Sequence, residues 1–327
     1  MTNGKTDIKK IVSYFGTLLM VVSMIFVAQR LRNTAGGEGG IDFGLLTSPW
    51  VIAGLLLVAT TEGLGILAAG LNFRALVRNV SGVVVNRVLA VKVYTESNVY
   101  KYIPGGVMYV AGRNRLAVEV DELSHGKVVM ATVIEGVCMV IGVIVVAAVF
   151  AYRHAADLIN YLGLVPILML IVGLVLIIAA PIVYFMRHRI GGVIKKLTTN
   201  METISWPVIA KRQGFSIILM FLYSVTFLMT LMLMGQEMNV SLGFAIIGLY
   251  LLAWLAGFLT PGAPSGLGIR EAVMVMFLTG FVDDGILVAA MVMHRVLTVI
   301  GDVFAFFVAW AISKMAAKSK IIENAQN

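Results

Sequence analysis

The chain has 327 residues, of which 60% are hydrophobic and only 13% are charged, and its mean hydropathy is +0.96. A soluble domain carries about 25% charged residues, so this composition excludes an ordinary soluble protein. Several apolar runs reach about 18 residues or more, the length that crosses a bilayer as a helix. The sequence therefore predicts an all-α, polytopic membrane protein.

The formal net charge of +8 does not indicate a nucleic-acid partner. The basic residues gather at the ends of apolar runs, as the positive-inside rule describes, and no basic face with interleaved aromatic residues occurs. The main groups are Lys9 with Lys10, Arg74 with Arg78, Arg187 with Arg189, Lys211 with Arg212, and Lys314 with Lys318. We expect a multi-pass protein of the cell membrane with its N-terminus in the cytoplasm and no nucleic-acid partner.

About seven or eight transmembrane helices are expected, all within one integral membrane domain of residues 1–327. The apolar runs predict spans at about 11–29, 49–71, 127–151, 161–186, 214–235, 241–259 and 286–313. Gln29 and Arg30 follow the first run in place of a small-residue cleavage site, which predicts a retained anchor. The basic, partly amphipathic stretch 187–213 predicts a segment on the cytoplasmic surface.

Two segments interrupt this pattern with proline and glycine. Residues 82–112 end in "KYIPGGVMYVAG" and mix apolar with charged residues, which favours a re-entrant or broken segment buried against other helices. Residues 260–271 contain "PGAPSGLGIRE" and lead into a short apolar piece that ends near residue 281. If residues 260–281 enter the membrane and return to the same side, the C-terminal lysines lie on the outer side of the membrane. The positive-inside trend favours the alternative, in which this piece spans in two broken parts.

The two breaks lie about half a chain apart, and an arginine follows each of them. Paired Gly/Pro-interrupted segments are typical of transporters built from internal repeats. The spacing predicts halves at about 1–186 and 214–320, joined by 187–213, and leaves both parallel and inverted repeats open.

Each break predicts an exposed helix N-terminus. Proline ends a helix, glycine allows close backbone approach, and the first N–H groups of the next helix need an acceptor. Ser265 is expected to cap a helix that begins near Gly266, while Gly268 leaves its first turn open and Arg270 adds a charge. This pattern indicates an anion site, most naturally for a phosphate. The alternative is that both breaks are ordinary kinks or turns.

Charged residues inside apolar runs are candidates for function, because each costs about 2.5–3.5 kcal/mol at the membrane centre. Glu62, Glu135, Arg295 and Asp302 are such residues. Arg295 and Asp302 recur at helical spacing and share one face with Thr298. These charges contact a ligand or pair with one another to hold helices together, and both interpretations stay open.

No feature predicts a cofactor, a metal site or an enzyme. The four histidines lack metal-ligand spacing, and no nucleotide loop or Ser-His-Asp order occurs. Cys138 lies in an apolar run and is expected to be a small packing residue.

The segments Lys101–Gly105, Gly112 with Arg113, and Ser265–Glu271 resemble motifs of the lysylphosphatidylglycerol synthase transmembrane-region family, whose members are described as flippase-like. The resemblance covers nearly the whole chain. Ser265 stands where glycine is usual in that family. The resemblance implies the membrane half of a synthase, without the soluble aminoacyl-transferase domain, and thus transfer of an anionic or modified lipid between leaflets.

The first hypothesis is therefore a lipid translocator for an anionic phospholipid or a polyprenyl-phosphate-linked sugar. A membrane-embedded transferase, or a non-catalytic lipid-binding partner of an envelope-synthesis enzyme, are the alternatives. The expected headgroup-binding residues are Lys101, Tyr102, Pro104, Gly105, Gly106, Arg113, Glu135, Ser265, Gly266, Gly268, Arg270, Glu271, Arg295 and Asp302.

Overall fold

The computed structural model is mostly helical in the part that it describes, which confirms the all-α, polytopic prediction. It describes residues 44, 47–102, 108–162, 204–260 and 264–326. Within these residues, five helices are long and apolar enough to cross a membrane. The predicted span at 11–29, most of the span at 161–186 and the segment 187–203 lie outside the described residues.

Helix α2 (Pro49–Ser81) begins with proline in its first turn and continues ten residues beyond the predicted end at residue 71. Gly82 ends it in the left-handed conformation, with φ of 74°, and donates its N–H to the Arg78 carbonyl over 2.8 Å. Arg78 lies in the last turn, where a cation interacts favourably with the helix dipole. The basic residues after the apolar run therefore belong to the helix.

The remaining long helices follow the predicted runs with extended ends. They are α6 (His125–Leu162), α8 (Trp206–Leu233), α9 (Val240–Leu259) and α11 (Asp284–Gln326). Helix α8 begins at Trp206, with proline in its first turn. Residues 206–213 are thus the first two turns of α8, and the prediction that they lie along the membrane surface is wrong.

The predicted broken segment 82–112 is re-entrant. It contains α3 (Arg87–Val99), the 3-10 turn η2 (Tyr100–Tyr102) and α4 (Met108–Arg113), and α5 (Leu116–Glu119) follows. Helix α3 starts just after α2 ends, and Lys127 at the start of α6 donates to the Ser81 carbonyl over 3.3 Å. The segment therefore leaves one end of the molecule and returns to it. We call α3, η2 and α4 the first hairpin.

The second break forms a hairpin from the opposite end. It contains α9, the 3-10 turn η4 (Pro264–Gly266) and α10 (Ile269–Leu278). The backbone N–H of Asp283, just after α10, donates to Gln236, just before α9, over 3.2 Å. The segment 240–281 thus returns to the end at which it starts, which corrects the favoured prediction that 260–281 spans. We call α9, η4 and α10 the second hairpin.

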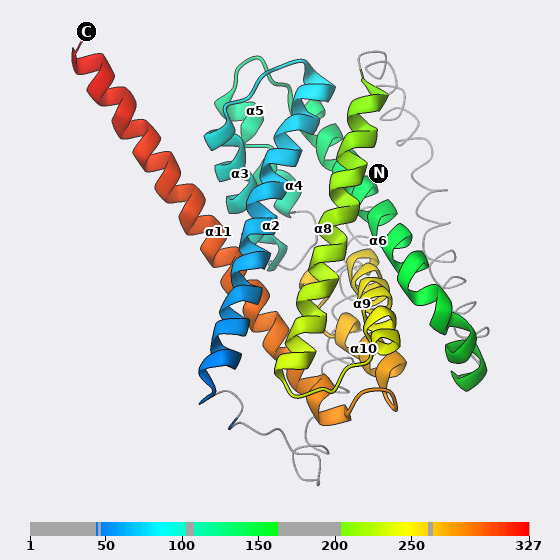
Figure 1. Ribbon diagram of the computed structural model, residues 1–327. Coiled ribbons are helices and arrows are strands. Elements are labelled where there is room, and N and C mark those ends of the chain that lie inside the picture. Colours follow the sequence, from blue (N-terminus) through cyan, green and yellow to red (C-terminus); the bar gives the residue numbers. More distant parts are fainter. Residues whose placement is uncertain (1–43, 45–46, 103–107, 163–203, 261–263, 327) are drawn as a thin grey trace, which may run out of the picture.

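The C-terminal lysines nevertheless lie at the same end of the molecule as the other basic groups, which we call the basic end. The reason is that α9 and α10 form one hairpin and not an additional crossing. Helices α2 and α8 run antiparallel, since Asn79 near the end of α2 bonds to Ser205 at the start of α8. Helix α11 runs in the direction of α2, and its C-terminal end projects away from the body (Figure 1). Arg78 and Lys211 therefore share one end of the molecule with Lys314.

The two hairpin tips meet inside the molecule, where η2 contacts η4. At this level α11 crosses α2 closely, because Gly63 and Gly301 face one another. A Cβ atom at Gly301 would lie 2.7 Å from the Glu62 Cβ and 2.9 Å from a backbone oxygen. Small residues allow such approaches between helices in membranes. Glu62 lies near the middle of α2, so the tips meet about halfway along that helix.

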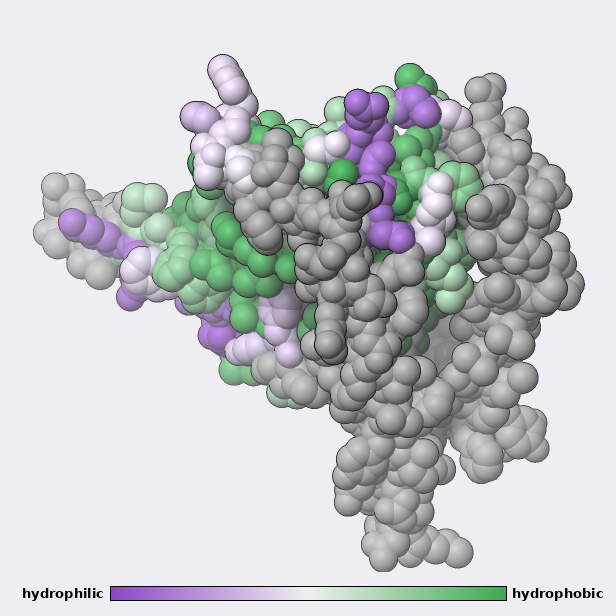
Figure 2. Space-filling model, turned by 90° about the horizontal axis from the view of Figure 1, so that it is seen from below, coloured by the Kyte–Doolittle hydropathy of each residue, from purple (hydrophilic) through white to green (hydrophobic). Residues whose placement is uncertain are grey.

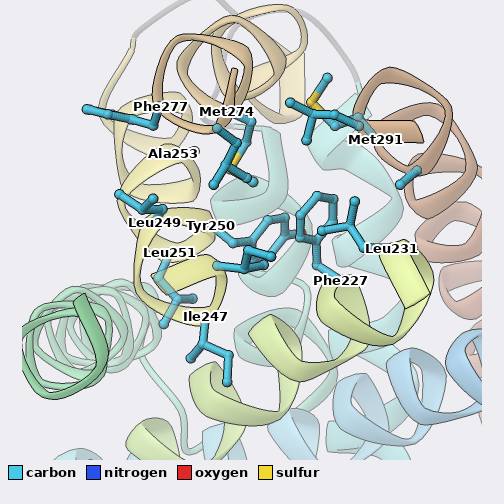
Figure 3. Packing of buried hydrophobic residues seen from close by; sticks show 14 of the residues in the cluster. Phe227, Leu231, Ile247, Leu249, Tyr250, Leu251, Ala253, Met274, Phe277 and Met291 are labelled. Carbon is cyan, nitrogen blue, oxygen red and sulfur yellow. The ribbon is translucent and has the colours of Figure 1, made fainter. Parts of the chain in front are cut away.

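The outer surface suits a lipid environment. Figure 2 looks onto the end opposite the basic one, where hydrophobic residues lie beside bands of hydrophilic ones. Large apolar side chains remain exposed on α2, α6, α8 and α11, for example Leu57, Val137, Ile218 and Phe307. The largest buried cluster packs α8, α9, α10 and α11 around Phe227 and Tyr250 (Figure 3).

Candidate functional site

The tip of the first hairpin is held by Asp302 of α11. The Asp302 carboxylate accepts hydrogen bonds from Asn98 Nδ2 over 2.7 Å and from the Tyr102 hydroxyl, and it lies 2.8 Å from Lys101 Nζ. Asp302 is buried, and only 3% of its surface is exposed. Three donors thus satisfy one carboxylate that would otherwise be very costly to bury. This arrangement, which we call the Asp302 latch, brings together Lys101, Tyr102 and Asp302, three of the residues expected to bind a headgroup.

The tip of the second hairpin is held by Arg295, also from α11. The two terminal nitrogens of Arg295 each donate to the Ser265 carbonyl over 3.2 Å, and its Nε donates to Glu271 Oε1 over 2.7 Å. Ser265 has a left-handed backbone, with φ of 52° and ψ of 23°, which is uncommon for a residue other than glycine. The guanidinium therefore ties a strained turn to the first turn of α10.

Ser265 does not cap a helix at Gly266, which corrects that prediction. Helix α10 begins at Ile269, and its N-cap Gly268 provides no side chain. Gly266 and Gly268 both have positive φ, at 66° and 79°. A Cβ at Gly266 would lie 2.8 Å from the Gly257 Cα, so the turn packs backbone against backbone on α9. These glycines therefore shape the turn that precedes α10.

Arg270 differs from the other arginines of the interior. Its terminal nitrogen donates to the Tyr223 hydroxyl over 3.0 Å, and its guanidinium lies 5.8 Å from the Trp254 ring centre. Within the described part of the chain it forms no ion pair, and its Nε has no hydrogen-bond acceptor. Arg270 is thus a cation without a carboxylate partner among the described residues, set beside an aromatic wall.

A small cleft opens beside Arg270, with about 20 Å³ of free space, which is room for about one water molecule. Its polar lining consists of Arg270, Glu271, His294, Arg295 and Thr298. Glu271 Oε1 binds Arg295, whereas Glu271 Oε2 has no hydrogen-bond donor among the described residues. The second break and α11 therefore place two cations and one carboxylate beside the cleft.

The rest of the lining is aromatic and thioether. It includes Tyr223 and the parallel rings of Phe227 and Tyr250, whose centres are 4.5 Å apart, with Met274 and Met291 beside them (Figure 3). Nothing in the sequence singles out these residues as site residues, because aromatic and methionine side chains are common throughout apolar helices. Only the contact with Arg270 distinguishes Tyr223.

His294 lines the same cleft but has both ring nitrogens engaged. One nitrogen lies 2.9 Å from the Tyr250 hydroxyl, and the other lies 3.3 Å from the Thr230 hydroxyl. It is buried among Phe227 and the two tyrosines. His294 therefore joins α8, α9 and α11 as part of the packed wall.

Glu62 lies deeper, between the cleft and the latch. It is buried, accepts a hydrogen bond from the Thr226 hydroxyl, and interacts electrostatically with Lys101, Asp302 and Arg270. Glu62 is thus within electrostatic reach of both the Asp302 latch and Arg270.

Arg113 and Glu135 form a separate buried ion pair that does not line the cleft. The Tyr94 hydroxyl donates to the second oxygen of Glu135 over 2.9 Å. The Arg113 guanidinium lies over the rings of Phe73, Tyr94 and Tyr109, at 4.9, 4.3 and 5.2 Å from their centres. The sequence grouped these residues with the second break, whereas the structure gives them a closed aromatic cage.

Pro104, Gly105 and Gly106 lie outside the described residues. Among the residues that the structure does describe, no three His, Cys, Asp or Glu side chains are grouped so that they could hold a metal ion. Cys138 is a buried free thiol.

Comparison with known proteins identifies the family. A family model described as the lysylphosphatidylglycerol synthase TM region matches residues 15–305, which confirms the resemblance of the sequence motifs. A search among curated proteins gives no match. Because the family model covers most of the chain, including both hairpins and the cleft, this integral membrane protein belongs to the lysylphosphatidylglycerol synthase transmembrane-region family.

Proposed function

We propose that the protein is a lipid translocator that moves an anionic phospholipid or a polyprenyl-phosphate-linked lipid between the leaflets of the cell membrane. The observation that carries this proposal is Arg270, a cation in an open cleft that has no carboxylate partner among the described residues. An arginine inside a membrane costs about 2.5–3.5 kcal/mol on insertion scales. A phosphate headgroup offsets this cost, because guanidinium binds phosphate with paired hydrogen bonds.

The hairpins supply the route for such a headgroup. They enter from opposite ends of the molecule and meet at η2 and η4, so polar groups reach the interior from both sides. Non-helical backbone at membrane depth is tolerated where it is buried in protein or lines a polar cavity. The Asp302 latch and the Arg295 contacts hold the two tips, and their release would let a headgroup pass while its tails stay in the bilayer.

We further propose that transfer involves no bond chemistry. A transferase acting on a lipid phosphate is the second candidate, because the free Glu271 Oε2 in the cleft could act as a base. Against this, His294 has both ring nitrogens engaged and Glu271 is already paired with Arg295. Both groups are thus committed to holding helices together.

Leaflet exchange in proteoliposomes tests the proposal. The purified protein would be reconstituted with fluorescent phosphatidylglycerol, or with a polyprenyl-phosphate sugar, and compared with Arg270→Ala and Arg270→Lys. We expect exchange to fall at least about tenfold in Arg270→Ala, since a charge-assisted hydrogen bond contributes about 1.5–3 kcal/mol. The lysine variant should recover part of the rate, because it keeps the charge but not the fork of donors.

Arg115→Ala is the matched control. Arg115 is 47% exposed and pairs with Glu96 and Glu119 away from the cleft, so its loss should leave exchange unchanged. Native exchange in a folded Arg270→Ala variant would overturn the proposal. Lipid binding without exchange by the native protein would favour the transferase or a lipid-binding partner, and mass spectrometry of the lipids separates those two.

A further inference from the structure

We propose that Glu62 and Thr226 form a proton-binding site near the middle of α2, and that the proton on Glu62 keeps the Asp302 latch closed. Neither residue lines the cleft beside Arg270. The inference rests on the translocator proposal for its effect on lipid exchange. The protonation of Glu62 is independent of that proposal and is tested without transport.

Glu62 differs from the other carboxylates of the interior in having no cation beside it. Three of those carboxylates form ion pairs, which are Glu135 with Arg113, Glu271 with Arg295, and Asp302 with Lys101. Glu62 is only 8% exposed and forms no ion pair within the described part of the chain. An ionised carboxylate is very costly to bury without a cation, whereas a protonated one is a neutral group that can donate. The surroundings of Glu62 therefore suit its protonated form.

The hydrogen count at the Thr226 hydroxyl supports the same form. This oxygen lies 2.7 Å from the Tyr223 carbonyl and is also in hydrogen-bond contact with the Glu62 carboxyl. A hydroxyl has one hydrogen to donate, and a carbonyl can only accept. If Thr226 donates to Tyr223, the contact with Glu62 contains a hydrogen only when Glu62 supplies it. With Glu62 ionised, one of the two contacts would bring two oxygen atoms together without a hydrogen between them.

The charged and titratable groups that face Glu62 are already engaged. They are Lys101 of η2, Asp302 of α11, Arg270 of α10 and Tyr250 of α9. Lys101 lies 2.8 Å from Asp302, and Arg270 donates to the Tyr223 hydroxyl. Helix α8 contributes the uncharged Thr226. On α3 and α6, the carboxylates of Glu96 and Glu135 pair with Arg115 and Arg113.

Lys101 connects the proton to the latch. While Glu62 is protonated, Lys101 is attracted to the Asp302 carboxylate without competition from Glu62. Loss of the proton to water leaves a second carboxylate within electrostatic reach of both latch residues. This new charge attracts the ammonium and repels the Asp302 carboxylate. Deprotonation should therefore weaken the latch and release the tip of the first hairpin, and reprotonation should close it again.

Infrared spectroscopy of the purified full chain tests the proton site. At neutral pH, we expect a carboxylic-acid C=O band in the native protein that is lost in Glu62→Gln. Thr226→Val should shift this band, because it removes the hydroxyl partner and leaves a side chain of similar shape. Glu119→Gln is the matched control, since the Glu119 side chain is 34% exposed and pairs with Arg115. That variant should keep the band. A native spectrum with no carboxylic-acid band from Glu62 would overturn the inference.

The pH dependence of lipid exchange tests the effect on the latch. Exchange of fluorescent phosphatidylglycerol would be measured in proteoliposomes from mildly acidic to mildly alkaline pH, with equal pH on both sides. Exchange by the native protein should rise with pH, by at most about tenfold per pH unit, because one carboxyl binds one proton. Glu62→Gln keeps the neutral form, so this variant should exchange slowly at every pH.

Asp302→Asn distinguishes release of the latch from a general loss of activity. Combined with Glu62→Gln, it removes the charge that holds Lys101, so the double variant should exchange faster than Glu62→Gln alone and without pH dependence. Native exchange that does not change with pH, or that changes equally in Glu62→Gln, would disprove the coupling of the proton to the latch. If the carboxylic-acid band is present but no lipid exchanges at any pH, the translocator proposal is wrong and the proton site stands.

Discussion

The Asp302 carboxylate of α11 lies 2.8 Å from the Lys101 ammonium of η2, although 201 residues separate them in the chain. This contact joins the tip of the first hairpin to the helix that also carries Arg295, the residue that holds the second hairpin. One helix therefore bears both attachments. A shift of α11 along its axis would act on the two tips together.

A double-mutant cycle tests the Asp302 latch. Lys101→Met and Asp302→Asn should each lower the free energy of unfolding. The loss in the double variant should be smaller than the sum of the two single losses by about 1–3 kcal/mol. The coupling is limited because Lys101 is 31% exposed and is partly screened. Unfolding in mixed micelles measures it. Strict additivity would show that the two side chains do not interact in the folded protein.

The Arg113–Glu135 pair is expected to act as a structural brace. Arg113→Ala leaves a carboxylate buried without its cation, which costs about 3–5 kcal/mol of unfolding free energy. Arg113→Lys should recover little, because a lysine cannot lie flat over the three rings of the cage. The measurement is the thermal unfolding midpoint in detergent.

Arg115→Ala again provides the control, since an exposed ion pair contributes at most about 1 kcal/mol. Any Arg113→Ala protein that folds should exchange lipid at the native rate per molecule. A variant with native stability and lost exchange would instead assign Arg113 to the lipid.

The crossing of α2 and α11 predicts a strong dependence on Gly301. In Gly301→Ala the new Cβ meets Glu62 at 2.7 Å and backbone atoms at 2.9 and 3.0 Å, so the helices must separate. We expect a loss of about 1–3 kcal/mol. Gly136→Ala is the matched control, because no atom lies within 4 Å of that position and alanine favours helix. Equal unfolding midpoints for the two variants would refute the close crossing.

The turn at η4 predicts that Gly266 cannot be replaced. Gly266→Ala combines a positive φ of 66° with a Cβ that lies 2.8 Å from the Gly257 Cα. Gly82→Ala has a similar φ of 74° but nothing within 4 Å, so it isolates the backbone strain of about 1–2 kcal/mol. The Gly266 variant should lose more stability than the Gly82 variant and should also lose lipid exchange. Matching losses would mean that the contact with α9 is unimportant.

The sequence predicts the helices well because apolar runs must span the membrane, but it places several ends too early. Helix α2 continues past Arg74 and Arg78, since basic side chains at a helix end reach the membrane surface on their flexible stems. Hydropathy cannot distinguish the arm of a hairpin from a full crossing. Helix α9 is apolar and long enough to span, yet it returns through α10.

The candidate site is only partly readable from the sequence. Charges within apolar runs single out Arg295 and Asp302, because each is costly in hydrocarbon, and the Pro/Gly break singles out Arg270 and Glu271. Which of these side chains contact one another cannot be predicted from the sequence, because the partners come from helices that are far apart in the chain. Nothing in the order of residues separates Arg113, enclosed with Glu135, from Arg270, which faces the cleft without a carboxylate partner among the described residues.

The meeting of the two hairpin tips has a consequence for the membrane potential. Polar groups and turn backbone reach inward from both ends and meet at the junction of η2 and η4. Under the proposed translocation, a lipid headgroup must pass this junction. A headgroup with one negative charge that moves across the whole membrane gains or loses about 2.3 kcal/mol per 100 mV. The direction of lipid movement should therefore respond to an imposed voltage.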